Sequence, residues 1–310
     1  MSLGELQVVT RVVAVVPVFD PGDDLVDLVR AIVPQVVSVI LVDDGSTAVG
    51  TAMMLARCTE LGARVVRHEH NRGIAAALNT GVEAASAPDG PGAEAVLTLD
   101  QDSAVTPGFV GALLQAWGAA LAAKVRVGLV APERVVGLPD QGRGRGPGGV
   151  LVGRDPIQSG TLVPVETVRA VGPFDEALVI DGVDADFALR CLDAGLAVVI
   201  APGLSLGHRL GARHEVRVGR RRLSLTRSAP SRYYYLARNR MVLLRRHGRR
   251  HPGWAAGQVV GLGGHLALVL TLVPDRQVKA REVARGIRDA ARGVTGPRPA
   301  PGAGAPDSRS

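Results

Sequence analysis

Residues 36–46 read VVSVILVDDGS, a run of mostly β-branched and aliphatic residues that ends in two aspartates and a Gly-Ser turn. An apolar run from Val36 to Val42 is typical of a parallel strand, whose two faces are both buried under helices. Open α/β sheets bind their ligands at the carboxyl ends of such strands. The stretch therefore predicts a buried strand that brings Asp43 and Asp44 to the ligand-binding edge of a sheet.

The rest of the sequence continues the alternation of strands and helices. Further strands are predicted at 12–18, 63–66, 95–99, 127–131 and 197–200, and helices at 25–32, 50–61, 71–85, 108–124 and 184–194. This order predicts an α/β fold, doubly wound around a mostly parallel sheet. One more strand ends in acids, because residues 97–107 read LTLDQDSAVTP and place Asp100 and Asp102 directly after it.

Composition fits a folded protein in a reducing compartment. The chain has 310 residues, 46% of them hydrophobic, which is enough for a sizeable core. Its two cysteines, Cys58 and Cys191, lack zinc-site spacing and are interpreted as buried structural thiols. The first apolar run, residues 12–19, contains a proline and leads into DPGDD, unlike a signal peptide. We therefore expect a cytoplasmic protein.

Positive charge is concentrated in the C-terminal part. Residues 209–251 hold fourteen arginines and one acid, Glu215, whereas the rest has 22 Lys/Arg against 28 Asp/Glu. A basic helix with tyrosines is predicted at 232–250, and the uncharged stretch 254–273 is either a buried or interfacial helix or a membrane span. These residues suit an anionic lipid surface at which the aromatics sit at the interface, although RNA or plain solvent would also suit such charge.

Three regions are expected: an α/β domain at 1–230, a basic and apolar helical region at 231–292, and a disordered tail at 293–310. The segment 137–153 is rich in Gly, Pro and Arg and is predicted to be a mobile loop, either solvated or acting as a lid.

Eight motifs occur in a fixed order along the chain. They are VVPVFDP (15–21), VDDGS (42–46), HNRGIAAALNTG (70–81), LTLDQDS (97–103), QSGTLVP (158–164), GPFDEALVIDGVDADFALR (172–190), LGHRLG (206–211) and RYYYLARN (232–239). This series resembles family 2 glycosyltransferases, and more narrowly the bacterial rhamnosyltransferases among them, over about residues 12–250. The resemblance implies a GT-A fold, a nucleotide-sugar donor, a divalent metal and inversion at the anomeric carbon.

The resemblance also implies roles for residues that bind the donor. Asp43 matches the acid that contacts the pyrimidine base, with Pro17 and Phe19 shaping its pocket. Arg72 is expected either to contact the nucleotide or to be solvated at a helix start. Asp100 would face the ribose or reach the metal through water.

Asp100 and Asp102 leave their strand two residues apart, so both can reach one hard cation such as Mn²⁺ or Mg²⁺. The resemblance assigns direct binding of the metal to Asp102 and to His208, with His214 as a rival histidine. Without a metal, an Asp-x-Asp pair is an ordinary solvated turn.

The resemblance places the catalytic base at Asp184, in VDADFALR. An inverting transfer needs one carboxylate that takes the proton of the acceptor hydroxyl. Asp186 and Asp181 are alternatives, and all three would also suit a helix N-terminus without catalysis.

The sequence departs from the family pattern at Asp20, where asparagine is usual, and in segment 137–153. We expect transfer of a deoxysugar, rhamnose from dTDP-rhamnose, to a polyprenyl-diphosphate-linked glycan at the inner face of the plasma membrane, with no nucleic-acid partner. The alternatives are a transferase using UDP-galactose or UDP-glucose, and a non-catalytic membrane- or RNA-binding protein on the same scaffold. A nicotinamide-dependent oxidoreductase is disfavoured, because VVPVFDPGDDL lacks the glycine-rich fingerprint.

Overall fold

A computed structural model of the chain describes residues 11–208, 213–218, 221–226, 229–272 and 275–298, with side chains at 11–207, 229–267 and 275–298. These residues form two compact units. Unit 1 comprises residues 1–176 and 183–227, and unit 2 comprises 177–182 and 228–310. Each unit is described by itself.

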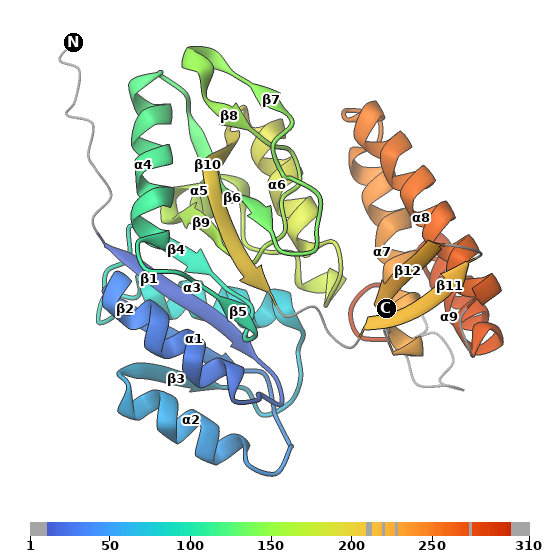
Figure 1. Cartoon of the computed structure of the whole chain (residues 1–310), viewed down its shortest axis with the longest axis horizontal. Helices are drawn as coiled ribbons and strands as arrows, with labels where there is room; N and C mark the ends of the chain where they lie inside the picture. Colours follow the sequence, from blue (N-terminus) through green and yellow to red (C-terminus); the bar gives the residue numbers. More distant parts are fainter. Residues whose placement is uncertain (1–10, 209–212, 219–220, 227–228, 273–274, 299–310) are drawn as a thin grey trace, which may run out of the picture. The chain divides into compact units, whose positions relative to one another are not determined.

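Unit 1 is built on a mixed ten-stranded sheet (Figure 1). Its main strands are β1 (Val12–Val18), β2 (Ser38–Asp43), β3 (Ala63–Arg67), β4 (Ala95–Thr98), β6 (Val127–Val135), β9 (Thr161–Pro164) and β10 (Ala197–His208), in the order β3-β2-β1-β4-β9-β6-β10. Neighbours among β3, β2, β1 and β4 are parallel, as are β6 and β10, and β9 lies antiparallel between β4 and β6. The predicted α/β fold with a mostly parallel sheet is confirmed.

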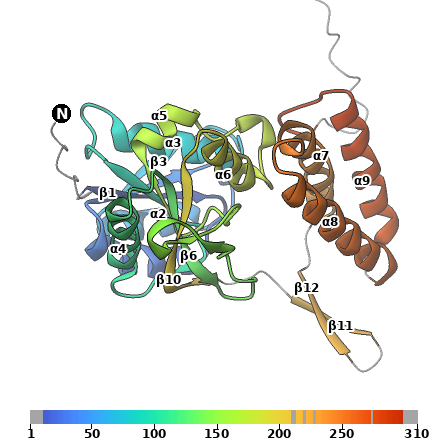
Figure 2. The same ribbon diagram turned by 90° about the horizontal axis from the view of Figure 1, so that it is seen from above.

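Helices cover both faces of this sheet (Figure 2). The helices of unit 1 are α1 (Asp24–Ile32), α2 (Thr51–Glu60), α3 (Ile74–Ser86), α4 (Phe109–Ala122), α5 (Val165–Val171) and α6 (Val183–Asp193). Alternate residues of β1, Val12 to Val18, join α1, α2 and α4 in one core. On the other face Gly81 of α3 lies against Val15, where a Cβ would come within 2.2 Å of Cγ1.

The segment 137–153, predicted to be a mobile loop, is partly ordered. It contains β7 (Gly144–Arg145), a 3₁₀ turn η2 (Pro147–Gly149) and β8 (Leu151–Val152). These two short strands pair with each other, and β8 pairs with β10 at Val199. They extend the edge of the sheet, so the segment that was predicted to be a mobile loop contains two short paired strands.

Two 3₁₀ turns, η1 (Val33–Gln35) and η3 (Glu176–Leu178), and a two-residue strand, β5 (Ser103–Ala104), complete the connections around the sheet. A separate antiparallel hairpin is formed by β11 (Arg213–Val218) and β12 (Arg221–Thr226).

Both cysteines are free and buried, as predicted, and burial raises the pKa of Cys191 to about 12, so its thiol stays protonated.

Unit 2 is helical, with α7 (Pro230–His247), α8 (Pro252–Leu272) and α9 (Arg276–Ala291). Tyr233, Tyr234 and Arg238 of α7 are at most 1% exposed. The tyrosines were expected at a lipid interface, and that expectation was wrong for these two because they form the core of the unit. Within the described residues, no helix combines the length and the apolarity that crossing a bilayer requires.

The start of the predicted disordered tail is tied to unit 2 within the described residues. The amide of Gly296 donates to the carbonyl of Ala177 at 2.8 Å, and the amide of Arg298 donates to the Tyr235 hydroxyl at 2.8 Å. Residues 299–310 lie outside the described residues.

Candidate active site

The parallel strands β1, β2 and β4 end at one edge of the sheet, and the predicted donor residues follow there. Pairing of Val18 with Asp43 and of Val15 with Thr98 fixes the three ends relative to one another. Gln101 fastens them further, because its amide accepts from the Phe19 N–H at 2.8 Å and donates to the Phe19 carbonyl at 3.1 Å. The fold thus brings Pro17, Phe19, Asp43 and Asp100 to a common edge.

Asp43 is fully buried at the end of β2. Its carboxylate accepts the Ser46 N–H at 3.0 Å and the Arg67 guanidinium at 2.7 Å. Burial alone would raise the pKa of Asp43, but hydrogen bonds from Ser46 and Arg67 outweigh it and hold the pKa below its ordinary value. The carboxylate is therefore ionised and is covered by Arg67, whose side chain is 57% exposed.

The neighbouring Asp44 organises the loop that carries Arg72. One of its oxygens accepts from His68 Nδ1 at 2.8 Å and from the Arg72 N–H at 2.9 Å, and the other accepts the Gly73 N–H at 2.8 Å. His68 in turn contacts the Thr80 hydroxyl at 2.9 Å through Nε2. Gly45, with a φ of 73°, packs against His70, where a Cβ would come within 2.5 Å of the backbone.

The side chain of Arg72 points to an acid. Its guanidinium donates to Glu176 at 3.2 Å, and the other oxygen of Glu176 accepts from the Asn79 amide at 2.9 Å. Asn79 also exchanges two 2.9 Å hydrogen bonds with the backbone of Phe174. Arg72 is thus paired with Glu176 just before α3, and its side chain stays 44% exposed.

Asp100 and Asp102 stand on a turn that a serine from another segment holds. The hydroxyls of Ser159 and Ser103 are hydrogen-bonded to each other at 2.6 Å. The Ser159 hydroxyl oxygen also accepts the Asp100 N–H at 2.9 Å. Both aspartates are partly exposed. The turn therefore presents two carboxylates beyond the end of β4, as the sequence predicts.

The backbone of β10 reaches the same turn. His208, the last residue of β10, pairs with Ser103, and Gly207 pairs with Ala104. The side chains of His208 and His214 lie outside the described residues. Where side chains are described, no three His, Cys, Asp or Glu residues gather closely enough to hold a metal ion.

The donor set nevertheless has the chemistry that a hard divalent cation requires. Two carboxylates on one turn supply oxygen ligands. The backbone of His208 pairs with Ser103, the residue that follows Asp102. The residues that would hold Mn²⁺ or Mg²⁺ are therefore Asp102 and His208, with Asp100 beside them. A metal at this position stays a prediction.

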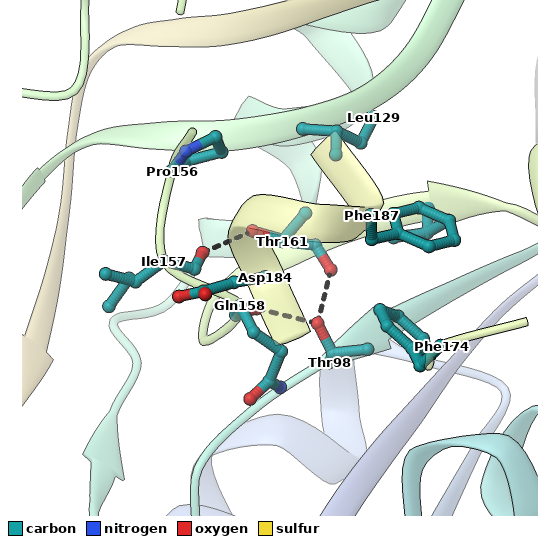
Figure 3. Close-up of a pocket in the computed structure, with 10 residues that line it drawn as sticks. Thr98, Leu129, Pro156, Ile157, Gln158, Thr161, Phe174, Asp184 and Phe187 are labelled. Atoms are coloured by element: carbon teal, nitrogen blue, oxygen red, sulfur yellow. Dashed lines mark hydrogen bonds between the residues drawn. The ribbon is translucent and has the colours of Figure 1, made fainter. Parts of the chain in front are cut away.

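Asp184 lies at the start of α6 and lines a small pocket (Figure 3). The other lining residues include Thr98 at the end of β4, Gln158, and Phe174 and Phe187, whose rings stack with centroids 4.5 Å apart. The Thr98 hydroxyl donates to the Gln158 carbonyl at 2.7 Å and so ties the pocket to the strand end. Asp184 is thus the predicted base that the fold places beside this edge of the sheet.

The two alternative bases are engaged in structural ion pairs. Asp186 is 1% exposed and bonds Arg190 at 2.8 Å, and Arg190 also donates to three backbone carbonyls at 171–173. Asp181 belongs to unit 2 and pairs with Arg232 at 2.8 Å and 3.1 Å. Of the three acids, Asp184 is the one that lines the pocket.

Several residues at this edge of the sheet have structural roles that the sequence did not predict. Asp20 accepts the N–H groups of Thr47 and Ala48 at 2.9 Å each, which explains how an acid serves where asparagine is usual. Gln101, Ser159 and His68 hold the loops together. A polar residue next to a motif signals such a role only weakly, because its partner is distant in sequence.

One buried polar atom in the pocket is unsatisfied. The Gln158 amide nitrogen is buried and has no hydrogen-bond partner. A buried donor without a partner is unfavourable, so the amide is available to a polar group of a ligand.

Comparison with known proteins agrees with this arrangement. Residues 13–134, from β1 to β6, match the family described as Glycosyl transferase family 2. The chain is also similar to a protein named dTDP-rhamnosyl transferase RfbF from Shigella flexneri, with 38% identity over 91 residues. The aligned stretch covers 29% of this chain and 30% of that protein, so it spans less than a third of the relative's length.

Among solved structures, TarS of S. aureus resembles the chain with a TM-score of 0.51 at 14% identity. The likeness covers 90% of this chain and 43% of the TarS chain. At this identity it concerns the fold alone, which is GT-A.

Proposed function

We propose that the chain is an inverting glycosyltransferase that transfers a deoxysugar, rhamnose from dTDP-rhamnose, to a lipid-linked glycan. The observation that carries this proposal is the position of Asp184, which lines a pocket with Thr98 of β4 while Asp43 and Asp100 follow the strand ends of the same sheet. A base beside a nucleotide-binding edge is the arrangement that sugar transfer requires.

In the proposed reaction, Asp184 takes the proton of the acceptor hydroxyl. The acceptor oxygen forms a bond to the anomeric carbon as the bond from that carbon to the diphosphate breaks on the opposite face, which inverts the centre. Asp102 and His208 would hold the Mn²⁺ or Mg²⁺, whose chemistry is to neutralise the charge of the leaving diphosphate.

The donor is proposed to lie over the ends of β1, β2 and β4. Pro17 and Phe19 would flank the pyrimidine base of the nucleotide, and Asp43 would accept a hydrogen bond from that pyrimidine. This contact requires Arg67 to move off the Asp43 carboxylate. Arg72 would exchange Glu176 for the nucleotide. The choice of rhamnose rests on the similarity to the named rhamnosyl transferase, and UDP-galactose and UDP-glucose are the competing donors.

The acceptor is proposed to be a polyprenyl-diphosphate-linked glycan at an anionic membrane surface. Exposed arginines at the end of α7 and just after it, Arg245, Arg246, Arg249 and Arg250, suit lipid phosphates. Val259 and Val260 of α8 are 57% and 76% exposed, which suits shallow insertion between headgroups. The competing reading is a non-catalytic membrane- or RNA-binding protein.

Calorimetric titration with dTDP-rhamnose, UDP-galactose, UDP-glucose and GDP-mannose, with and without Mn²⁺, tests the donor site. We expect binding of one donor that depends on Mn²⁺ and is lost in Asp102→Ala. The matched control is Asp89→Ala, which removes an exposed carboxylate from the loop after α3. If folded wild-type protein binds none of the four, the non-catalytic reading replaces the proposal.

A further inference from the structure

Residues 177–182 interrupt unit 1 in sequence but belong to unit 2 by their contacts. They follow Glu176, which holds Arg72, and they end at the residue before α6 begins at Val183. The candidate base Asp184 is therefore two residues beyond this segment. The conformation of 177–182 therefore determines how the backbone enters α6.

The backbone of the segment adopts conformations that L-residues rarely occupy. Val179 has a φ of 65° and Asp181 a φ of 61°, and Gly182 follows with 94°. The amide of Ile180 donates to the Leu178 carbonyl at 2.7 Å, which closes a tight three-residue turn around Val179. A positive φ at a β-branched residue is strained and persists only where the surroundings enforce it.

Asn239 of α7 supplies much of that enforcement. Its amide nitrogen donates to the carbonyls of Leu178 at 2.8 Å, Ile180 at 2.6 Å and Asp181 at 2.9 Å. Its amide oxygen accepts from Arg238 Nε at 2.8 Å. Because a guanidinium can only donate, this contact turns the amide nitrogen toward the three carbonyls.

Arg238 is itself buried, with 1% of its surface exposed, and it bonds the start of the segment. Its Nη2 donates to the carbonyls of Ala177 at 3.0 Å and Leu178 at 3.2 Å. The guanidinium lies 5.4 Å and 5.0 Å from the ring centroids of Tyr234 and Tyr235. Two tyrosines of the motif RYYYLARN, Tyr234 and Tyr235, thus help to hold the Arg238 guanidinium in place.

The end of the segment is held in two further ways. Arg232 pairs with both oxygens of Asp181 at 2.8–3.1 Å. Gly182 lies against Leu243, where a Cβ would come within 2.8 Å of Cδ1. A side chain at 182 would meet both the positive φ and this close contact.

We infer that Arg232, Arg238 and Asn239 form a clamp that positions Asp184 for catalysis by fixing residues 177–182. The inference rests on the proposed function, in which Asp184 is the base. The three are positioning residues, because they act on the chain that leads into α6. The helical unit is then required for turnover even where the donor binds to unit 1 alone.

Asn239→Asp tests the clamp, since it keeps the acceptor for Arg238 and removes the donors to the three carbonyls. Arg298→Gln is the matched control, because Arg298 also belongs to unit 2 and its guanidinium pairs with Glu282 of α9, outside the segment. Arg232→Gln is the second variant and is used if Asn239→Asp does not fold.

Two measurements are made on each variant. Hydrogen exchange of amides 177–186 is expected to accelerate about tenfold or more in Asn239→Asp, with β1, β2 and β4 unchanged. The second measurement is hydrolysis of dTDP-rhamnose, with water as the acceptor. We expect the kcat of Asn239→Asp to be about tenfold or more below that of the wild type, with little change in KM, because the catalytic base is misplaced while the donor still binds.

Unchanged exchange at 177–186 in folded Asn239→Asp and Arg232→Gln would overturn the clamp. Accelerated exchange with an unchanged kcat would overturn its catalytic role. If wild-type protein neither binds nor hydrolyses a nucleotide sugar, the proposed function fails and the catalytic role with it. The exchange data still decide whether the clamp exists, so the two failures are distinguishable.

Discussion

Asp43 and Asp44 are adjacent aspartates at one strand end, but their side chains have different partners. Asp43 is covered by Arg67, whereas Asp44 accepts from His68 and from two backbone amides. Asp44 was predicted to lie at the ligand-binding edge of the sheet, without the partners that the structure gives it. Its long-range partners, 24 to 29 residues away, give the loop at 68–73 its shape.

Replacing Asp44 should destabilise the protein, because the Arg72 and Gly73 amides and the His68 ring lose their acceptor. We expect Asp44→Ala to lower the free energy of unfolding by about 3 kcal/mol. Urea unfolding measures this. The exposed Asp89→Ala should change it by less than about 0.5 kcal/mol. Equal stabilities of the two variants would contradict the role given to Asp44.

Much of the candidate site was predictable from single residues and their spacing. Asp43, Asp100 and Asp102 follow buried strands, so parallel strand ends bring them together. The burial of Arg238 was not predictable, because a count of charges treats every arginine of 209–251 alike. Only the tertiary structure shows that Arg238 bonds backbone carbonyls instead of facing a surface.

At the scale of elements, long periodic segments were predictable and short ones were not. The helices α3, α4 and α7 lie within a few residues of their predicted positions. Strands β7 and β8 have two residues each and sit in a Gly-rich segment, so no periodicity reveals them. The antiparallel direction of β9 was also hidden, because an apolar run does not encode direction.

Helix α8 offers a test of pH dependence. His265 stacks on Tyr233 with centroids 6.1 Å apart, and burial lowers the pKa of His265 below its ordinary 6.5. The unfolded chain therefore takes up this proton at a higher pH than the folded one. Its contribution to stability is complete above about pH 6.5 and is lost as pH falls through the folded pKa.

Thermal melting of wild type and His265→Phe checks this sign. The variant keeps a ring against Tyr233 but cannot titrate. Between about pH 7.5 and about pH 5.5 we expect the wild-type Tm to fall more than that of the variant. Parallel curves for the two proteins would show that His265 does not link protonation to folding.

In the whole molecule, the family match covers only the N-terminal part of the chain, residues 13–134. It ends at residue 134, before the pocket residues at 156–187 and before the helical unit. Acceptor binding is therefore the part that a family assignment informs least. The helical unit contributes a basic helix end and an exposed apolar stretch on α8.

Vesicle binding tests the role of that stretch. We expect co-sedimentation with phosphatidylglycerol vesicles but not with phosphatidylcholine vesicles, because arginines need anionic headgroups. Val259→Asp with Val260→Asp should reduce binding about tenfold, whereas Val49→Asp, at an exposed site of unit 1, should not. Binding that survives the double variant, or a preference for RNA over vesicles, would argue against a lipid surface.

The release of dTDP from dTDP-rhamnose by Asp184→Asn tests whether Asp184 is the catalytic base of a nucleotide-sugar transferase. Asparagine keeps the size of the side chain but cannot take the proton. We predict unchanged folding and donor binding with a kcat lower by a factor on the order of 10² to 10⁴. Turnover by Asp184→Asn at the wild-type rate would contradict the account and return Asp186 and Asp181 to consideration.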